Sequence, residues 1–288
     1  MKTLLSIIAI FTVLMSNAQL QYPNATYWNN SSVYNPAYTG IEYKHQLTTY
    51  GNLIGGNYGL YNKGFANNNF MGLYNFKFDK INSGFGINYQ NYNIGLVKVS
   101  SIKSSYSYIF RLKNNALLST GISMGYTSTK YDTGEDPEYG FLIDKEGFLG
   151  DLGIVYKADK FDIGFSFISN YYGDFNRIDD LYQFNLNGSY KFNAGDFTIT
   201  PGAYAVYRFK DVDFINLNLR LSYKNKIEIG GAYNVSNYAK RSFFIGYNIS
   251  DKFKISYSYS KDDYNHVFFQ DEKVVKNIHE LLFSMIIR

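Results

Sequence analysis

The sequence predicts an all-β protein, a transmembrane antiparallel β-barrel of the outer-membrane type with about fourteen strands. Three observations support this prediction. Apolar and polar residues alternate along most of the chain, aromatic residues make up 19% of its 288 residues, and short connections alternate with long ones. A period of two is the pattern of a strand with one apolar and one polar face. Short turns at one rim and long loops at the other are typical of outer-membrane barrels.

The start of the chain has the pattern of an export signal. Lys2 supplies positive charge, an apolar core of twelve residues follows from Leu4, and Ala18 ends a run of small residues suited to cleavage. The apolar core is too short to span a bilayer as a helix. We therefore expect residues 1–18 to be a signal peptide that is removed on export.

The segment 19–40 lacks the alternation and ends in the sextet NPAYTG. Pro36 fixes its own φ and favours an extended Asn35, whereas Gly40 allows a bend that other residues resist. We expect a plug-like segment on the periplasmic side, with the sextet as an elbow between this segment and the wall. The barrel is then expected over residues 41–288.

Fourteen alternating runs follow the sextet. Most are about ten residues long, which is the length that a tilted transmembrane strand needs. A closed barrel is required in lipid because an open sheet edge leaves backbone groups unpaired. The expected strands are 41–50, 68–79, 84–94, 101–111, 115–127, 149–158, 161–169, 181–192, 196–208, 213–224, 226–235, 240–249, 252–261 and 277–288.

The lengths of the connections favour a membrane barrel over a soluble sheet protein. Connections after even-numbered strands are tight, whereas those after odd-numbered strands include the long segments 51–67, 128–148, 170–180 and 262–276. A soluble β-sandwich or solenoid would need the same apolar faces but gives no reason for this difference. An even strand count returns both ends of the barrel to the short-turn, periplasmic side.

Pro201 conflicts locally with this pattern. It lies inside the expected strand 196–208, although proline cannot donate a backbone hydrogen bond and a closed barrel has no edge strand. The alternation places Pro201 on the lipid-facing side of the wall. Gly202 beside it suggests a β-bulge.

The sequence contains no motif for catalysis or cofactor binding. The histidines His45, His266 and His279 lack metal-ligand spacing, and His279-Glu280 is not continued to the H-E-x-x-H pattern of zinc enzymes. Cysteine is absent, and no G-x-S-x-G or phosphate-binding loop is present. A net charge of +4 is too small to indicate nucleic-acid binding. We expect a protein that is not an enzyme, with no cofactor and no nucleic-acid partner.

Two long loops, 128–148 and 262–276, combine carboxylates with aromatic residues. Clustered carboxylates are calcium ligands, but their spacing in 128–148 matches no EF-hand, and a solvated acidic loop is the simpler interpretation. Aromatic side chains on loops are frequent interface anchors and are equally typical of the membrane interface, so both alternatives stay open. The candidate partner-binding residues are Tyr131, Tyr139, Phe141, Phe148, Tyr264, Phe268 and Phe269.

The polar faces of the strands predict a wet lumen of small side chains with a few charges. Fourteen strands leave more room than an eight-stranded barrel, whose side chains fill it. The sequence does not settle whether this space conducts or is plugged. The charged positions are Lys103, Lys191, Arg220 and Lys254, opposed by Asp151, Asp162 and Glu228.

Two patches within this layout resemble a known family, the PorP/SprF outer-membrane proteins of Bacteroidetes. They are the sextet before the first strand, with Asn35, Pro36, Ala37, Tyr38 and Gly40, and the pair His279-Glu280 at the last strand. The resemblance implies a non-catalytic part of the type IX secretion system, linked in some members to gliding motility. It further implies delivery or retention of a secreted protein with a C-terminal sorting domain, and contact with periplasmic components of the system.

A porin or FadL-like transporter is the alternative function, since FadL-like barrels also have fourteen strands. Such transporters carry a longer N-terminal hatch, whereas about twenty-two residues precede the first expected strand here. This difference favours a barrel that holds an exported partner at the cell surface.

Overall fold

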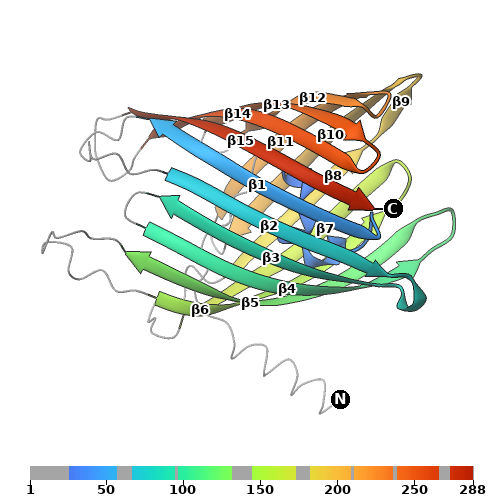
Figure 1. Ribbon diagram of the computed structural model, residues 1–288, viewed down its shortest axis with the longest axis horizontal. Coiled ribbons are helices and arrows are strands. Elements are labelled where there is room, and N and C mark those ends of the chain that lie inside the picture. The colour runs from blue at the N-terminus through green and yellow to red at the C-terminus, as the bar shows by residue number, and fades with distance from the viewer. Residues whose placement is uncertain are drawn as a thin grey trace, which may run out of the picture.

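The computed structural model describes residues 26–56, 67–94, 97–131, 145–172, 182–208, 211–235, 239–265 and 273–287. They form an antiparallel β-barrel around a short coiled segment (Figure 1). The signal peptide expected at residues 1–18 lies outside the described residues. The 3₁₀ turns are η1 (Tyr27–Asn29), η2 (Ser31–Val33), η3 (Pro36–Tyr38) and η4 (Asp79–Ile81), and the strands are β1 (His45–Gly56), β2 (Asn67–Phe78), β3 (Ser83–Ile94), β4 (Val97–Arg111), β5 (Leu117–Tyr131), β6 (Lys145–Lys157), β7 (Phe161–Tyr172), β8 (Tyr182–Tyr190), β9 (Phe192–Ala194), β10 (Phe197–Arg208), β11 (Asp211–Tyr223), β12 (Ile227–Asn234), β13 (Ala239–Ser250), β14 (Phe253–Asn265) and β15 (Lys273–Ile287).

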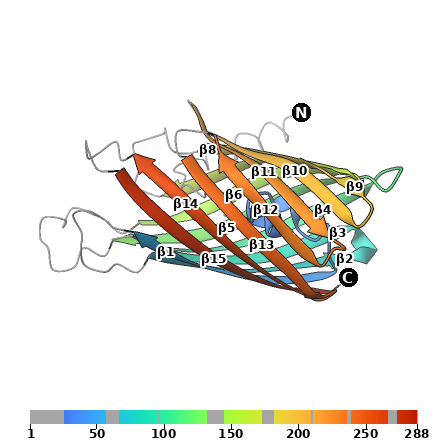
Figure 2. The ribbon, with the colours of Figure 1, turned by 90° about the horizontal axis from the view of Figure 1, so that it is seen from above.

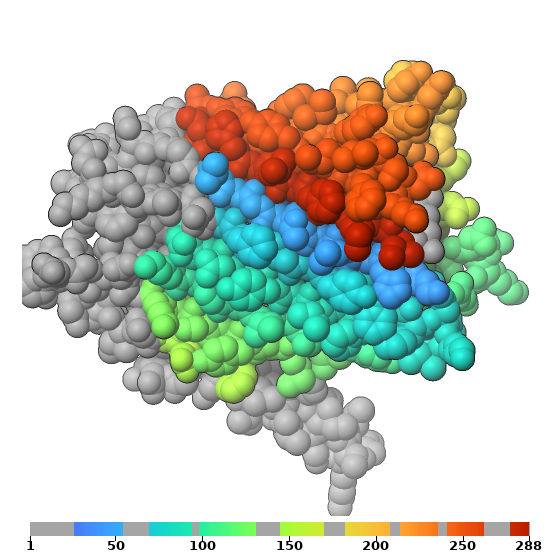
Figure 3. Space-filling model, viewed as in Figure 1, coloured from blue at the N-terminus to red at the C-terminus, as the bar shows by residue number. Residues whose placement is uncertain are grey.

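Consecutive strands pair antiparallel, and the last strand returns to the first. The β1–β15 register runs from His45 opposite Ile287 to Gly56 opposite Lys276. Two side-chain hydrogen bonds cross this seam inside the barrel, between Thr48 and Ser284 (2.9 Å) and from Tyr50 to Glu280 (2.9 Å). The space-filling view shows a continuous wall across the seam (Figure 3). The predicted closed barrel is confirmed.

Of the fifteen strands, β8 and β9 occupy one position in the wall, which gives the predicted fourteen. Both strands pair with β10, and the register is the same for both. Only Thr200 and Pro201, which lie between the two paired stretches, have no partner on this side. Because proline has no N–H, it removes a rung of the ladder without shifting it. The bulge predicted at Gly202 is therefore wrong, and the register of β10 instead shifts between Val206 and Tyr207, against β11.

Tight turns join the strands at one end, the short-turn rim, where the C-terminal strand also ends (Figure 1). Several of these turns contain residues in the left-handed backbone conformation that asparagine and glycine tolerate best. Positive φ values occur at Asn82, Asn114, Asn115, Gly195, Lys224 and Asn225.

The connections at the opposite end, the long-loop rim, are shorter than predicted because the strands continue beyond their apolar stretches. β5 extends to Tyr131 and β6 begins at Lys145, so the loop expected at 128–148 reduces to 132–144. Polar residues such as Lys98 and Lys130 still pair in the ladder, since backbone hydrogen bonds do not depend on side-chain polarity. Similarly, the loop expected at 262–276 reduces to 266–272.

The wall is apolar outside and polar inside. In β14, Phe253, Ile255 and Tyr257 are exposed on the outer face, whereas Ser256 and Ser258 are buried in the lumen. Exposed apolar residues in such number suit a hydrocarbon environment, in which a polar outer face would be costly. Within the described part of the chain, no helix is long and apolar enough to cross a membrane.

Candidate functional site: a plug in the lumen

Residues 26–40, here called the plug, lie inside the barrel in the half nearest the short-turn rim. Figures 1 and 2 show this coil enclosed by the wall from two directions. Three 3₁₀ turns compact it, and all of its residues are buried except Trp28, Asn29 and Ser31, which are partly exposed. The first wall strand begins at His45, not at Ile41, so residues 41–44 connect the plug to β1.

The sextet has the backbone that its residues dictate. Asn35 is extended (φ −149°, ψ 109°) before Pro36, which opens the turn η3, and the Asn35 side chain caps this turn by accepting a hydrogen bond from Ala37 N (3.0 Å). Gly40 has a φ of 68°, in the region that favours glycine. The sextet therefore folds back on itself within the lumen before the chain reaches the wall.

The end of the sextet touches the backbone of β3 directly. A Cβ on Gly40 would lie 2.7 Å from the Cα of Gly84, and a Cβ on Gly84 would lie 2.1 Å from the carbonyl oxygen of Thr39. Real Cβ atoms do not approach other atoms so closely. Ser107 on β4 donates a hydrogen bond to the same Thr39 oxygen (2.6 Å). Two glycines thus permit a contact between plug and wall that side chains would block.

The start of the sextet docks in the same way on β5 and β6. A Cβ on Gly121 would lie 2.4 Å from Ala37 N, and one on Gly153 would lie 2.0 Å from Asn35 Oδ1. The Asn35 amide donates to the backbone oxygens of Ile154 (3.3 Å) and Phe165 (3.1 Å). The wall therefore has a shallow bed of glycines shaped to the sextet.

Tyr38 and the following linker connect to charged groups near the short-turn rim. The Tyr38 hydroxyl donates to Asp162 and accepts from Asn187 Nδ2 (2.5 Å). Lys157 pairs with Asp162 (3.6 Å) and with Glu42. The neighbouring Lys157 ammonium lowers the pKa of Glu42 below its ordinary value. These pairs fasten the exit of the plug to β6 and β7.

A buried ion pair holds the middle of the plug. Lys103 on β4 donates to the Val33 carbonyl (2.9 Å) and pairs with Asp151 on β6 (2.5 Å), with side-chain exposures of 7% and 1%. Ser123 donates a further hydrogen bond to Asp151 (2.6 Å). Burying two charges is costly unless both find partners, and here the plug backbone supplies one of them.

Neutral polar groups hold the next plug carbonyl. The Tyr34 oxygen accepts from Ser166 on β7 (2.7 Å) and from Asn185 on β8 (3.3 Å). Buried backbone oxygens outside regular structure need such partners. Small polar side chains of the predicted lumen face therefore act here as hydrogen-bond donors to the plug.

Trp28 anchors the first part of the plug on the opposite side of the barrel. Its indole N–H donates to Glu228 (3.2 Å), the guanidinium of Arg220 lies 4.8 Å from its ring, and the Phe244 ring packs at 4.8 Å. Lys254 donates to Asn29 Oδ1 (2.8 Å) beside it. A cation over an indole face is favourable, more so when water is excluded. The predicted lumen charges Arg220, Glu228 and Lys254 converge on this single side chain and its neighbour.

An apolar patch inside the lumen was not predicted from the sequence. Tyr27, Val33 and Tyr34 of the plug pack against inward-facing apolar residues of five wall strands. One sequence signal could have revealed this patch. Where both faces of a strand are apolar, the alternation of apolar and polar residues stops, as it does in the Ala-Tyr-Ala-Val run of β10. The wall residues of this patch are Tyr50, Met71, Leu73, Tyr204, Val206, Phe214 and Leu282.

Two small cavities lie in the lumen among the residues that the structure describes. One, of about 20 Å³, lies between the plug and residues Gln46 and Asn75, and the other, of about 30 Å³, lies against Lys103 and Asp151. One water needs roughly 10–15 Å³ of such space, so each of these cavities has room for one or two waters. Neither has room for a substrate.

The candidate partner-binding residues are only partly described. Phe148 lies on the outer face of β6, 65% exposed, with its ring 6.1 Å from that of Tyr126. It belongs to the wall and not to a loop, because β6 begins before it. Tyr131 ends β5 and Tyr264 lies in β14, whereas Tyr139, Phe141, Phe268 and Phe269 lie outside the described residues.

The pair His279-Glu280 lies inside β15, which begins at Lys273, and its two side chains face opposite ways. His279 is exposed outside, with its Nδ1 2.8 Å from the Tyr257 hydroxyl, and Glu280 is buried inside, where it accepts from Tyr50. Within the described ranges, no group of three or more His, Cys, Asp or Glu side chains is placed to hold a metal ion. Most of the acidic loop considered for calcium lies outside those ranges.

The sequence matches the family described as "Type IX secretion system membrane protein PorP/SprF" over residues 16–283. The chain belongs to the PorP/SprF family. This PorP/SprF protein is therefore a non-enzymatic membrane protein of the type IX secretion system with an outer-membrane β-barrel fold. The family predicted from the sequence is confirmed.

Solved structures similar to the PorP/SprF barrel are outer-membrane channels. The CymD monoaromatic hydrocarbon channel has a TM-score of 0.61 at 12% identity, with 96% of this chain and 94% of that chain covered. The toluene transporter TbuX of Ralstonia pickettii has a TM-score of 0.58 at 10% identity, with 90% of this chain and 93% of that chain covered. A Pseudomonas aeruginosa FadL homologue has a TM-score of 0.54 at 12% identity, with 95% of this chain and 100% of that chain covered. At such identities the likeness shows the fold alone. No curated protein sequence matches significantly.

Proposed function

We propose that this PorP/SprF protein delivers or retains a secreted protein with a C-terminal sorting domain at the cell surface, after its own export by a signal peptide at residues 1–18. The observation that carries the proposal is the plug. It occupies the lumen near the short-turn rim through hydrogen bonds, ion pairs and apolar contacts from β1 round to β15. A lumen filled at this end fits a protein that is used through its rims and not through its bore.

The long-loop rim is the surface proposed for the secreted partner. Outer-membrane barrels direct their longer loops outward and their short turns to the periplasm. A specific interface needs about 800 Å² from each partner, which tight turns do not offer. The connections 132–144 and 266–272 carry Tyr139, Phe141, Phe268 and Phe269, and aromatic anchors dominate the energy of many interfaces. Periplasmic components of the secretion system are then expected at the short-turn rim.

The test is a loop deletion followed by mild cross-linking and purification from native outer membranes. Replacing residues 133–143 by a short Gly-Ser linker is expected to abolish recovery of one large exported protein while the barrel still assembles. A matched control shortens the connection 57–66, which lies at the same rim and contains no acidic cluster. Equal recovery of the partner in both variants would contradict the assignment of this loop.

A transporter like the FadL homologues is the alternative, and it predicts a different result. The purified barrel would then pass ions or take up small apolar molecules, and cross-linking would recover no partner. That combination would overturn the proposed function.

A further inference from the structure

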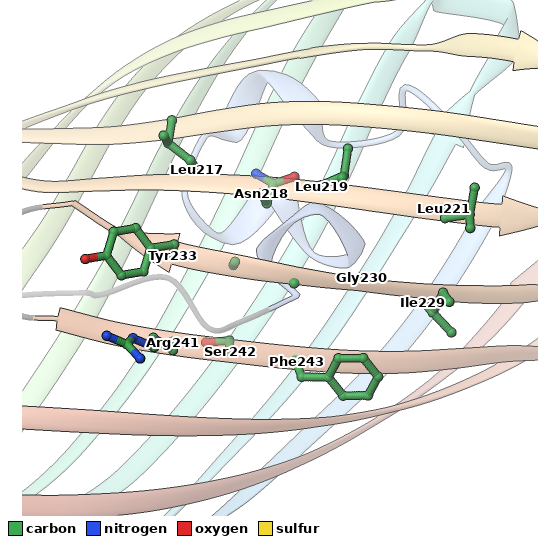
Figure 4. A pocket seen from close by; sticks show the side chains of 12 residues that line it. Leu217, Asn218, Leu219, Leu221, Ile229, Gly230, Tyr233, Arg241, Ser242 and Phe243 are labelled. Carbon is green, nitrogen blue, oxygen red and sulfur yellow. The ribbon is translucent and has the colours of Figure 1, made fainter.

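The outer face of the wall contains an apolar groove over β12. Its volume is about 650 Å³, within the range of roughly 300–1,000 Å³ seen for small-ligand pockets (Figure 4). Gly231 forms its floor, because this outward-facing position has no side chain. Its neighbours in the register are Leu219 on β11 and Phe243 on β13, which form the two sides. Leu221 and Ile229 line the groove toward the short-turn rim.

Toward the long-loop rim, the groove ends at a polar group. Tyr233 and Arg241 are neighbours in the next row of the register, and both line the groove (Figure 4). Lys261 on β14 is the next residue in this row, directly opposite Arg241, and both side chains are exposed. Among the side chains that the structure describes, no carboxylate forms an ion pair with either cation. Two cations therefore stand at one end of an apolar groove.

These cations lie at the depth of the membrane interface. Arg241 lies nine positions before Ser250, which is at the short-turn rim. At about 3.3 Å per residue and a tilt of about 40°, this corresponds to roughly 23 Å across the membrane, close to the apolar band of about 25 Å. By the usual orientation of outer-membrane barrels, Arg241 and Lys261 then lie at the headgroup level of the outer leaflet.

We propose that the groove binds a phosphorylated lipid of the outer leaflet. One acyl chain lies over Gly231 between Leu219 and Phe243, and the phosphate is held by Arg241 and Lys261. Guanidinium groups bind phosphate through paired hydrogen bonds, and these strengthen where water is scarce. The arrangement of apolar groove and cationic end matches the two parts of such a lipid, and it is independent of what the loops or the plug do.

The test uses the purified full-length barrel in a nonionic detergent and native mass spectrometry. Diphosphorylated lipid A is the probe, and zwitterionic phosphatidylcholine is the comparison lipid. We expect one lipid A to bind in preference to phosphatidylcholine. Because hydrogen bonds to charged groups are strong, R241Q combined with K261Q is expected to weaken lipid A binding about tenfold or more. This exposed pair of changes is expected to leave the barrel folded, and heat-dependent gel mobility checks this.

Filling the groove provides a second variant. Gly231→Leu is expected to reduce lipid A binding while leaving Arg241 and Lys261 in place. Gly150→Leu is the matched control, because Gly150 also faces outward and a Cβ there would meet nothing within 4 Å. Lys98→Gln controls for loss of an outward-facing cation elsewhere on the long-loop rim. Unchanged binding in R241Q/K261Q, or equal affinity for both lipids, would overturn the proposal. Binding lost equally in G150L and G231L would also overturn it, as would binding of a membrane-protein partner in place of lipid.

Discussion

Asn35 and Gly153 lie so close that a single carbon added to the glycine would sit 2.0 Å from the amide oxygen of the asparagine. Asn35 caps the turn η3 with that same oxygen, while its amide nitrogen holds two wall carbonyls. The glycine and the asparagine are 118 residues apart in the sequence. Their contact shows that the wall is fitted to the sextet as much as the sextet is fitted to the wall.

Replacing a bed glycine is expected to displace the plug without opening the barrel. Gly153→Val puts a branched side chain where Asn35 lies, and overpacking of this kind costs about 1–3 kcal/mol. We expect faster protease cleavage near Trp28 with unchanged far-UV circular dichroism. Gly150→Val, on the outer face of the same strand, is the control. Valine favours strands, so a loss of stability in Gly153→Val alone would point to the plug and not to the strand.

The buried Lys103–Asp151 pair predicts a non-additive mutant cycle. Lys103→Met leaves Asp151 as an unpaired buried charge, which typically costs about 3–5 kcal/mol. Removing both charges with Lys103→Met and Asp151→Leu is expected to restore much of this loss. Urea unfolding in detergent measures each variant. Equal costs for the single and the double variants would show that the pair is not desolvated.

The linker after the plug is expected to loosen in acid. The pKa of Glu42 is lowered from its ordinary value of 4.5, chiefly by Lys157. A lowered pKa in the folded protein contributes stability above pH 4.5, and that contribution is lost as the pH falls through the folded value. Cleavage of the linker by an acid-active protease should therefore rise in the parent protein as the pH falls below 4.5. Glu42→Gln should cleave faster at neutral pH and lose this pH dependence. A parent protein with a flat profile would contradict the prediction.

Charge on the outer face should cost free energy according to depth. Leu152→Arg, near the middle of β6, is expected to destabilise the barrel by about 2–4 kcal/mol, whereas Ile81→Arg at the short-turn rim should cost about 0–1 kcal/mol. Both residues are exposed and apolar, so the difference isolates the effect of membrane depth. Unfolding from lipid vesicles gives both values. Equal costs would show that Leu152 and Ile81 do not lie at the different membrane depths assigned to them.

The barrel could be predicted from the sequence because most wall residues obey a local rule. The alternation of Phe253, Ile255 and Tyr257 with serine and lysine sets which face meets lipid, and turn residues such as Asn225 set where strands end. The ends of the strands were less predictable, because backbone pairing continues through polar residues such as Lys130. The bulge expected at Gly202 failed for a similar reason: the ladder tolerates one missing donor without a change of register.

The docking of the plug could not be read from the sequence. Pro36 and Gly40 indicate a bend, but nothing local shows that Gly84, Gly121 and Gly153 face it, since this depends on how distant strands are aligned. The alternation predicts Lys103 and Asp151 as lumen charges but gives no indication that they meet. The candidate loop residues are predicted from composition alone, and Phe148 was wrongly placed in a loop because its strand starts earlier than its apolar stretch.

The seam between β1 and β15 implies an order of assembly. The plug precedes β1 in the chain and lies inside a wall whose first and last strands are joined through Thr48–Ser284 and Tyr50–Glu280. Once these strands have paired, a segment of this bulk has no lateral way in. The plug is therefore either enclosed as the nascent wall wraps around it or inserted afterwards through the short-turn rim. In the first route, the plug would serve as a template for the strands that follow it.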